Sequence, residues 1–213
     1  MKKDTISKRQ LERYPKYLVY LRKLQEESID HISSRALAEV FECSEEQVRK
    51  DFQAISKDKG KPKSGRSVQS MVNDLEDFLD YHNNKDAVIV GVGKLATAIL
   101  NYDGFSKYGL SILAGFDIEK SGYEINGKKI YHIDQMEKII KKLNVKIAII
   151  TTTKQAAQPT ADRLMKCGIK AIWNFAPTRL EVNDDVAVED VDLAASLAVL
   201  SHKLRQKENA KNE

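Results

Sequence analysis

The sequence predicts an α/β protein with two parts: an N-terminal winged helix-turn-helix domain, and a C-terminal Rossmann-type domain with a doubly wound parallel sheet and a terminal helix. Three observations support this fold class. Residues 1–66 have helical periodicity and are basic, with 16 Lys and Arg against 11 Asp and Glu. From residue 86 onward, apolar runs alternate with helical patterns. The first of those runs ends in a glycine-rich turn.

The first 56 residues predict three helices. One starts near Pro15, which suits a first turn, and the second starts at Ser33-Ser34. The third starts at Ser44, because Ser44-Glu45-Glu46-Gln47 has the S-x-x-Q form of a capping box. Only residues 41–43 separate the last two helices, so we expect a helix-turn-helix whose second helix can enter a DNA major groove.

A basic loop follows the third helix. Residues 47–66 hold seven Lys and Arg against two Asp, and the loop contains Gly and Pro. As the wing of a winged helix it would lie beside phosphates, and the alternative is a solvated surface loop. We therefore expect double-stranded DNA as a partner. The expected contacts are Ser44, Gln47, Arg49, Lys50, Lys57, Lys59, Lys61, Lys63 and Arg66.

A dinucleotide site is predicted where the run 87–90 meets Gly91-Val92-Gly93-Lys94-Leu95-Ala96. In a strand–turn–helix context, Gly91 would allow the turn, Gly93 would let the backbone approach a pyrophosphate, and Ala96 would let the helix pack closely. The helix N-terminus would add unpaired N–H groups. A turn without any ligand is the alternative.

The next apolar run, 110–116, ends at Asp117. A carboxylate at that point would accept hydrogen bonds from the adenosine ribose and would disfavour a 2′-phosphate, so NAD is preferred over NADP. A helix or turn cap is the other interpretation of Asp117. Further strands are expected near 129–131, 147–151, 171–173 and 186–188, with helices over 134–143 and 155–167, where Pro159 is tolerable only in the first turn.

The tail, residues 191–204, has high helical propensity and is apolar over most of its circumference. It is expected to pack against another subunit of a homodimer, which would also present two helix-turn-helix units to a palindromic operator. Packing on its own sheet is the alternative. The expected domains are therefore 1–80 for DNA binding, 85–188 for NAD(H) binding, and 189–213 for dimerisation.

Other classes of protein find little support. No apolar run is long enough for a membrane span, and the first residues lack the apolar region of a signal peptide, so a cytoplasmic location is expected. The two cysteines and four histidines have no metal-ligand spacing, so no metal site is predicted. No acid or base constellation stands out near the expected nicotinamide, and no enzymatic activity is expected.

The chain resembles the Rex family of bacterial redox-sensing transcriptional repressors. The resemblance covers nearly the whole length, in ordered segments that share the family's motifs. These are 13–17, 32–34, 48–52, 91–96, 101–105, 116–117, 156–158, 167–169, 174–177 and 191–193. It implies a homodimer that exchanges its last helix between protomers, binds operator DNA when NAD dominates, and releases it when NADH binds.

The resemblance also implies residue roles. It implies that residues 91–96 contact the pyrophosphate and Asp117 the ribose, and that Arg49 and Lys50 lie on DNA. Thr151, Thr152, Asn174 and Phe175 would lie near the nicotinamide. Tyr102 and Asp192 match the pair that relays the redox state to the partner's DNA-binding domain.

This chain departs from the family pattern in several places. It has Val19 where the family has an arginine that pairs with the residue matching Asp192. Its wing is lysine-rich, whereas the wing of the family is rich in aromatic residues and glycine. The fingerprint ends in Ala96 instead of glycine, and Thr152-Thr153 stands where the family has V-P. Two other functions stay open at this point. One is an NAD-dependent oxidoreductase with a basic appendage, and the other is a regulator that senses CoA or an adenine nucleotide.

Overall fold

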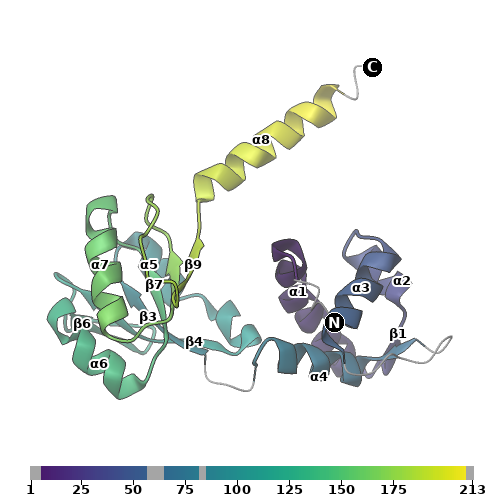
Figure 1. Ribbon diagram of the computed structural model, residues 1–213, viewed down its shortest axis with the longest axis horizontal. Helices are drawn as coiled ribbons and strands as arrows, with labels where there is room; N and C mark the ends of the chain where they lie inside the picture. Colours follow the sequence, from purple (N-terminus) through teal and green to yellow (C-terminus); the bar gives the residue numbers. More distant parts are fainter. Residues whose placement is uncertain (1–5, 57–64, 82–84, 210–213) are drawn as a thin grey trace. The chain divides into compact units, whose positions relative to one another are not determined.

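The computed structural model describes residues 6–56, 65–81 and 85–209, and these form two compact units (Figure 1). The first unit comprises the described residues before Lys85 together with 104–109, and the second comprises the remainder. Residues 104–109 therefore pack with the first unit although their neighbours in sequence on both sides belong to the second. The bounds of the three predicted domains stay predictions.

Four helices build the first unit around one core. Each helix starts at a serine whose hydroxyl accepts the backbone N–H three residues on, which satisfies a donor that the helix start leaves open. A short antiparallel pair of strands, β1 (His31–Ile32) and β2 (Arg66–Ser67), flanks them. The helices are α1 (Lys8–Glu26), α2 (Ser34–Val40), α3 (Glu45–Ile55) and α4 (Val68–Phe78).

The prediction for the first helix start was wrong. Helix α1 begins at Lys8, capped by Ser7, and continues through Pro15 in its interior. The proline removes the bond that its N–H would give to the Leu11 carbonyl, and Leu11 is exposed, so water can replace that bond. Burial of the side chains that follow outweighs this loss. The buried residues of α1 are Tyr14, Tyr17, Leu18, Leu21 and Leu24.

The second unit is a seven-stranded sheet in the order β5-β6-β4-β3-β7-β8-β9, parallel except for the β5–β6 pair. Its central strands are nearly continuous apolar runs because both faces are buried. The strands are β3 (Lys85–Val90), β4 (Leu110–Asp117), β5 (Glu124–Ile125), β6 (Lys128–His132), β7 (Ile147–Ile150), β8 (Ala171–Asn174) and β9 (Ala187–Asp190).

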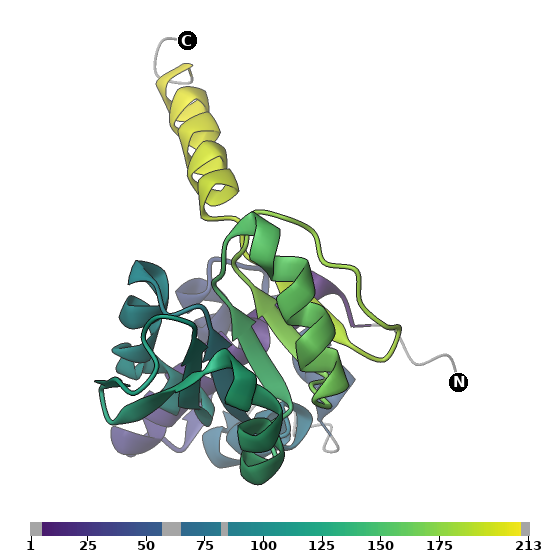
Figure 2. The ribbon, with the colours of Figure 1, turned by 90° about the vertical axis from the view of Figure 1, so that its left-hand side faces the viewer.

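Helices α6 (Met136–Leu143) and α7 (Lys154–Lys166) cover one face of the sheet, the face towards the viewer in Figure 2, and α5 (Lys94–Leu100) follows β3. From β3 the chain runs to β4 on one side, and it later returns to β7 on the other side. The order of the strands therefore reverses between β3 and β7. In open α/β sheets, the crevice outside the carboxyl ends of the strands at such a point is where ligands bind.

Three local predictions in this unit need correction. Pro159 is the sixth residue of α7, beyond the first turn, and Gln155, whose carbonyl loses a partner, is exposed. The predicted helix 134–143 opens with a 3₁₀ turn over Ile133–Gln135 before α6. The segment between 117 and 129, where the sequence indicated no strand, contains β5, because Asn126 and Gly127, both with positive φ (48° and 74°), form the N-G turn that closes a tight hairpin.

The terminal helix α8 (Leu193–Asn209) has no buried residue. Leu193, Leu197, Leu200 and Leu204 recur at intervals of four, three and four residues, and each is at least 57 % exposed. Packing of this helix on its own sheet, the alternative from the sequence, is therefore absent from the described chain.

Candidate functional site

The carboxyl ends of β3, β4 and β7 enclose a cavity of about 330 Å³ beside the glycine-rich turn. Gly91, Gly93, Asp117, Thr151 and Thr152, all predicted cofactor residues, line it. Residues from α7, Ala156 and Thr160, complete its wall. The turn between β3 and α5 is therefore the floor of a recess at the point where the strand order reverses.

The two glycines are required for different reasons. Gly91 has φ +86°, and a Cβ there would lie 2.8 Å from Thr152 Cγ2, so the fold itself requires glycine. Gly93, the residue that caps α5, has φ −78°, which any residue adopts, and a Cβ there would meet nothing within 4 Å. No contact within the described residues therefore demands glycine at 93, and close approach of a ligand to the backbone would account for it.

Asp117 holds the turn together. Its Oδ2 accepts the Val92 N–H at 2.6 Å, and its Oδ1 accepts the N–H groups of Glu119 at 2.8 Å and Lys120 at 3.0 Å. Burial, the largest single influence, acts to raise the pKa of Asp117, but these backbone bonds and Lys120 outweigh it and hold the pKa below its ordinary value. The carboxylate stays ionised, and one of its roughly four lone-pair positions remains for a further donor.

The two threonines after β7 differ. The Thr151 hydroxyl donates to the carbonyls of Val90 at 3.1 Å and Gly91 at 2.7 Å, so it fixes the turn to β7. The Thr152 hydroxyl oxygen is buried and has no hydrogen-bond partner in the described part of the chain. A buried hydroxyl without a partner is costly, and a polar ligand in the cavity would satisfy it.

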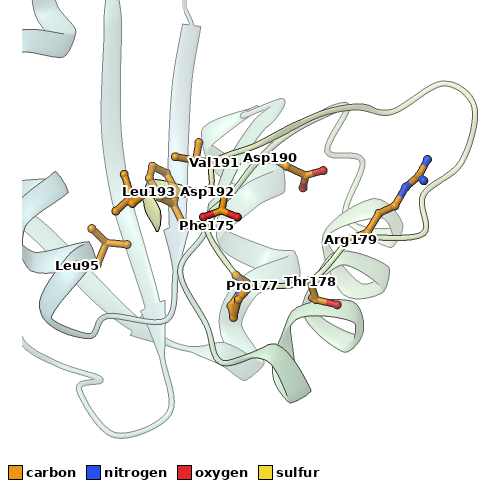
Figure 3. Close-up of a pocket in the computed structure, with 10 residues that line it drawn as sticks. Leu95, Phe175, Pro177, Thr178, Arg179, Asp190, Val191, Asp192 and Leu193 are labelled. Carbon is orange, nitrogen blue, oxygen red and sulfur yellow. The ribbon is translucent and has the colours of Figure 1, made fainter. Parts of the chain in front are cut away.

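The remaining predicted cofactor residues lie around the same turn. Val92 is buried, Lys94 and Leu95 are exposed at the start of α5, and Ala96 is buried beneath it. Leu95 and Phe175 line a second cavity, of about 530 Å³, with residues 176–179 and 190–193 (Figure 3). Arg179 extends from the loop on the side of this cavity away from Leu95 (Figure 3).

Asn174 holds together three residues that line the second cavity. Its Nδ2 donates to the Thr178 carbonyl and to Asp190 Oδ1, each at 2.8 Å, and its Oδ1 accepts the Ala176 N–H at 3.0 Å. The side chain is 1 % exposed, so it organises the loop and β9. Of the two residues predicted there, Phe175 lines the cavity and Asn174 supports it.

The two predicted relay residues lie at the ends of different helices, Tyr102 after α5 and Asp192 before α8. Tyr102, just after α5, is 61 % exposed. Asp192 lines the second cavity, and its Oδ1 accepts the Ala195 N–H at 2.9 Å at the start of α8.

The predicted DNA-contact residues lie on α3 and β2, apart from the wing. Ser44 caps α3, and Arg49 and Lys50 are exposed on it and paired with Glu45 and Glu46 one turn earlier. On β2, the Arg66 guanidinium lies 5.7 Å from the centroid of the Phe52 ring. Lys57, Lys59, Lys61 and Lys63 fall outside the described residues.

The predicted capping box is only half formed. Ser44 Oγ accepts the Gln47 N–H at 3.1 Å. In a complete box the Gln47 amide oxygen would accept the Ser44 backbone N–H, but the Gln47 side chain instead turns to the next turn of the helix, where its Nε2 donates to Asp51 at 3.0 Å. Asp51 is fully buried and bound by Arg13. Sequence reasoning missed both residues, although a carboxylate within the apolar stripe of α3 was a signal that a buried partner exists.

A helix-turn-helix unit joined to a Rossmann-type unit with a nucleotide-sized recess is the architecture of a ligand-responsive transcription regulator. Two family models match: "Putative DNA-binding protein N-terminus" over residues 5–53, and "CoA binding domain" over 82–178. A redox-sensing transcriptional repressor Rex from Treponema denticola is 37 % identical over 92 % of this chain and 93 % of its own. The chain belongs to the Rex family of redox-sensing transcriptional repressors.

Solved structures of RSP, a Rex-family repressor, have the same fold as this chain. The complex of RSP with NAD⁺ and operator DNA is 35 % identical, with a TM-score of 0.87 over 97 % of this chain and 96 % of that one. The complex with NADH is 34 % identical, with a TM-score of 0.83 over 98 % of both chains. The predicted family and fold class are confirmed. No helix within the described ranges meets the length and hydropathy that crossing a bilayer requires.

Proposed function

We propose that this chain represses transcription according to the ratio of NADH to NAD, as a cytoplasmic homodimer that binds a palindromic operator when NAD dominates and releases it when NADH binds. The single observation that carries the proposal is the recess at the glycine turn, which contains the open space at Gly93, the ionised Asp117 and the buried Thr152 hydroxyl, which has no partner among the described residues. RSP, of the same family, is bound in solved structures to NADH and to NAD⁺ with operator DNA.

The residues present fit a dinucleotide. Gly93 would let the pyrophosphate approach the backbone, Asp117 would accept a ribose hydroxyl at its remaining lone pair, and Thr152 would bond a polar group in the recess. Leu95 and Phe175 would flank the nicotinamide in the second cavity. Bound NAD and NADH present rings that differ by one positive charge and in shape, and this difference is the signal.

Sensing requires that the two cofactors bind the DNA-competent and the released arrangements with different affinities. A tenfold preference is worth about 1.4 kcal/mol, and equal affinity would shift nothing. Tyr102 and Asp192 are the proposed relay, with Val19 in place of an arginine partner. We also propose that operator DNA is contacted by Arg66 and by four residues that cap or lie on α3, Ser44, Gln47, Arg49 and Lys50. The lysines of the wing, Lys57, Lys59, Lys61 and Lys63, would bind phosphates.

The homodimer is proposed from α8. Its leucine stripe would bury a large apolar surface only against another chain, since its own unit covers none of it. Exchange of α8 between protomers would achieve this.

A titration tests the proposal. Operator binding would be measured by mobility shift at fixed total dinucleotide while the ratio of NADH to NAD is varied. We expect binding to fall as NADH rises. Equal effects of the two dinucleotides would refute redox sensing and leave DNA binding standing.

A second candidate ligand is CoA or another adenine nucleotide, favoured by the match of residues 82–178 to the CoA binding domain. Calorimetry with NADH, NAD and CoA side by side distinguishes the ligands. An oxidoreductase has less support, because the relatives are transcriptional repressors.

A further inference from the structure

The carboxylate of Asp51 on α3 is fully buried, and side chains of two helices saturate it with hydrogen bonds. From α1, Arg13 donates from Nε to Oδ2 at 2.6 Å and from Nη2 to Oδ1 at 2.7 Å. The Tyr17 hydroxyl donates to Oδ2 at 3.0 Å, and Gln47 Nε2 donates to Oδ1 at 3.0 Å. Two carboxylate oxygens offer about four lone-pair positions, so each position has a donor.

This network determines which way the Gln47 amide points. Arg13 is always protonated, and its bidentate contact with both oxygens of Asp51 has the geometry of an ion pair with a carboxylate, which can only accept hydrogen bonds. Turned by half a rotation, the amide would set its oxygen against Asp51 Oδ1, two acceptors at hydrogen-bond distance. The nitrogen must therefore face Asp51, and the oxygen and the second N–H remain for an outside partner.

The position of Gln47 on α3 also lets its free amide oxygen and second N–H contact DNA. It is the third residue of α3, and the first residues of a recognition helix are those that reach base edges in the major groove. Its backbone is held by the Ser44 cap, and its side chain is only partly exposed. Arg49 and Lys50 are exposed, and each is paired with a glutamate one turn earlier on the same helix, whereas Gln47 is bonded to a buried carboxylate, so Gln47 is the most rigidly oriented of the three.

We propose that Gln47 is a specificity-determining residue that reads adenine in the operator, and that buried Asp51 is the positioning residue that fixes its amide. An amide oxygen and an N–H side by side match the N6 donor and N7 acceptor of adenine. The inference rests on the proposed operator binding.

The test is selection of binding sites by the full-length chain from duplexes with randomised half-sites. The wild type is expected to enrich one sequence with an adenine at a defined position. Gln47→Met, which keeps the length but removes both polar atoms, should reduce the preference for that adenine about tenfold, as expected for one bidentate contact, and leave other positions unchanged. Gln53→Met, the same change at an exposed position of α3, is the matched control and should keep the adenine.

Two further variants separate reading from positioning. Gln47→Glu sets a carboxylate against Asp51 Oδ1 and has no N–H to offer adenine, so it should lose the adenine preference; if Asp51 holds the side chain at 47, this variant should also unfold at a lower temperature than Gln47→Met. Asp51→Asn can present an N–H to either end of the Gln47 amide, so the adenine preference should weaken although Gln47 is retained. Thermal unfolding shows whether Asp51→Asn folds. If it does not, Gln47→Met decides whether Gln47 reads adenine, and the Tm of Gln47→Glu relative to Gln47→Met decides whether Asp51 holds the side chain at 47.

The outcomes distinguish the two proposals. If the wild type enriches no sequence, operator binding itself fails. If the wild type selects an operator but Gln47→Met selects the same one with equal preference, the inference about Gln47 is overturned. If Gln47→Met changes the selection while folded Asp51→Asn does not, Gln47 reads DNA without positioning by Asp51, and that half of the inference is overturned.

Discussion

Replacing Gly93 by alanine separates what the fold requires from what a ligand requires. A Cβ at 93 would meet nothing within 4 Å, and the backbone there has φ −78°, so the free protein can accept it. In the proposed complex this methyl group would occupy the space in which the pyrophosphate lies close to the backbone of residue 93. The variant is therefore expected to fold normally and to bind NADH poorly.

The expected stability change comes from two opposing effects. Removing a glycine from an unstrained position stabilises by about 0.4–1 kcal/mol through the unfolded chain. Alanine is a poorer helix N-cap than glycine, which costs a few tenths of a kcal/mol or more, about the same size. The net change should lie within about 0.5 kcal/mol, a shift in Tm of roughly 2 °C or less for a chain of this size. Gly91→Ala, the control, should cost at least about 1 kcal/mol, because φ is +86° and Thr152 leaves no room.

Calorimetric titration of NADH into both variants, with thermal unfolding in its absence, checks this reasoning. The affinity of Gly93→Ala for NADH should fall at least tenfold, about 1.4 kcal/mol, while its Tm stays near that of the wild type. Gly93→Ser, a better cap with a larger side chain, should raise the Tm and bind no better. Wild-type affinity in Gly93→Ala would refute the role given to the open space, and a loss of stability as large as that of Gly91→Ala would show that the fold requires both glycines.

Three more predictions follow from the same structure. Because the pKa of Asp117 is lowered, its ionised form adds stability that is complete above the ordinary aspartate pKa and is lost as the pH falls through the lowered pKa. Asp117→Asn should therefore lose less Tm than the wild type as the pH falls below the ordinary aspartate pKa, and an equal loss of Tm in both proteins would contradict this. Arg49→Ala should weaken operator binding by about 1–3 kcal/mol if it reads a base, or reduce the salt slope by about one if it contacts only phosphate; equal affinity at every salt concentration would remove Arg49 from the interface. Leu197→Glu should shift the protein from dimer to monomer in sedimentation, whereas Lys203→Glu on the same exposed helix should not, and a dimeric Leu197→Glu would place the interface elsewhere.

The sequence predicted the fold where a single strong pattern controls local structure. The buried runs before Gly91 and Asp117 became β3 and β4, and the serines at 33 and 44 start α2 and α3. It failed where two local rules competed. Pro15 suggested a helix start, but the Ser7 cap and the buried side chains of α1 extend the helix through it.

The site could be predicted only as far as sequence neighbours define it. The fingerprint places the turn, but the contrast between Thr151, which bonds two carbonyls, and Thr152, which bonds none in the described chain, depends on how β7 meets β3. The Asp51 network likewise joins residues 38 positions apart in sequence, Arg13 and Asp51. No spacing rule reveals such a pair, because the packing of α1 against α3 creates it.

The largest feature that sequence reasoning missed is the membership of 104–109 in the N-terminal unit. The Tyr81 hydroxyl donates to the Lys107 carbonyl at 2.8 Å, and Arg22 binds Tyr81 and Glu76, each at 2.6 Å. The chain therefore contributes to the first unit twice, and the Lys107 carbonyl joins the two contributions, because it accepts from Arg22 Nη1 at 3.3 Å as well as from Tyr81. Such a return of the chain depends on side chains more than 25 positions apart, and no local pattern in residues 104–109 indicates it.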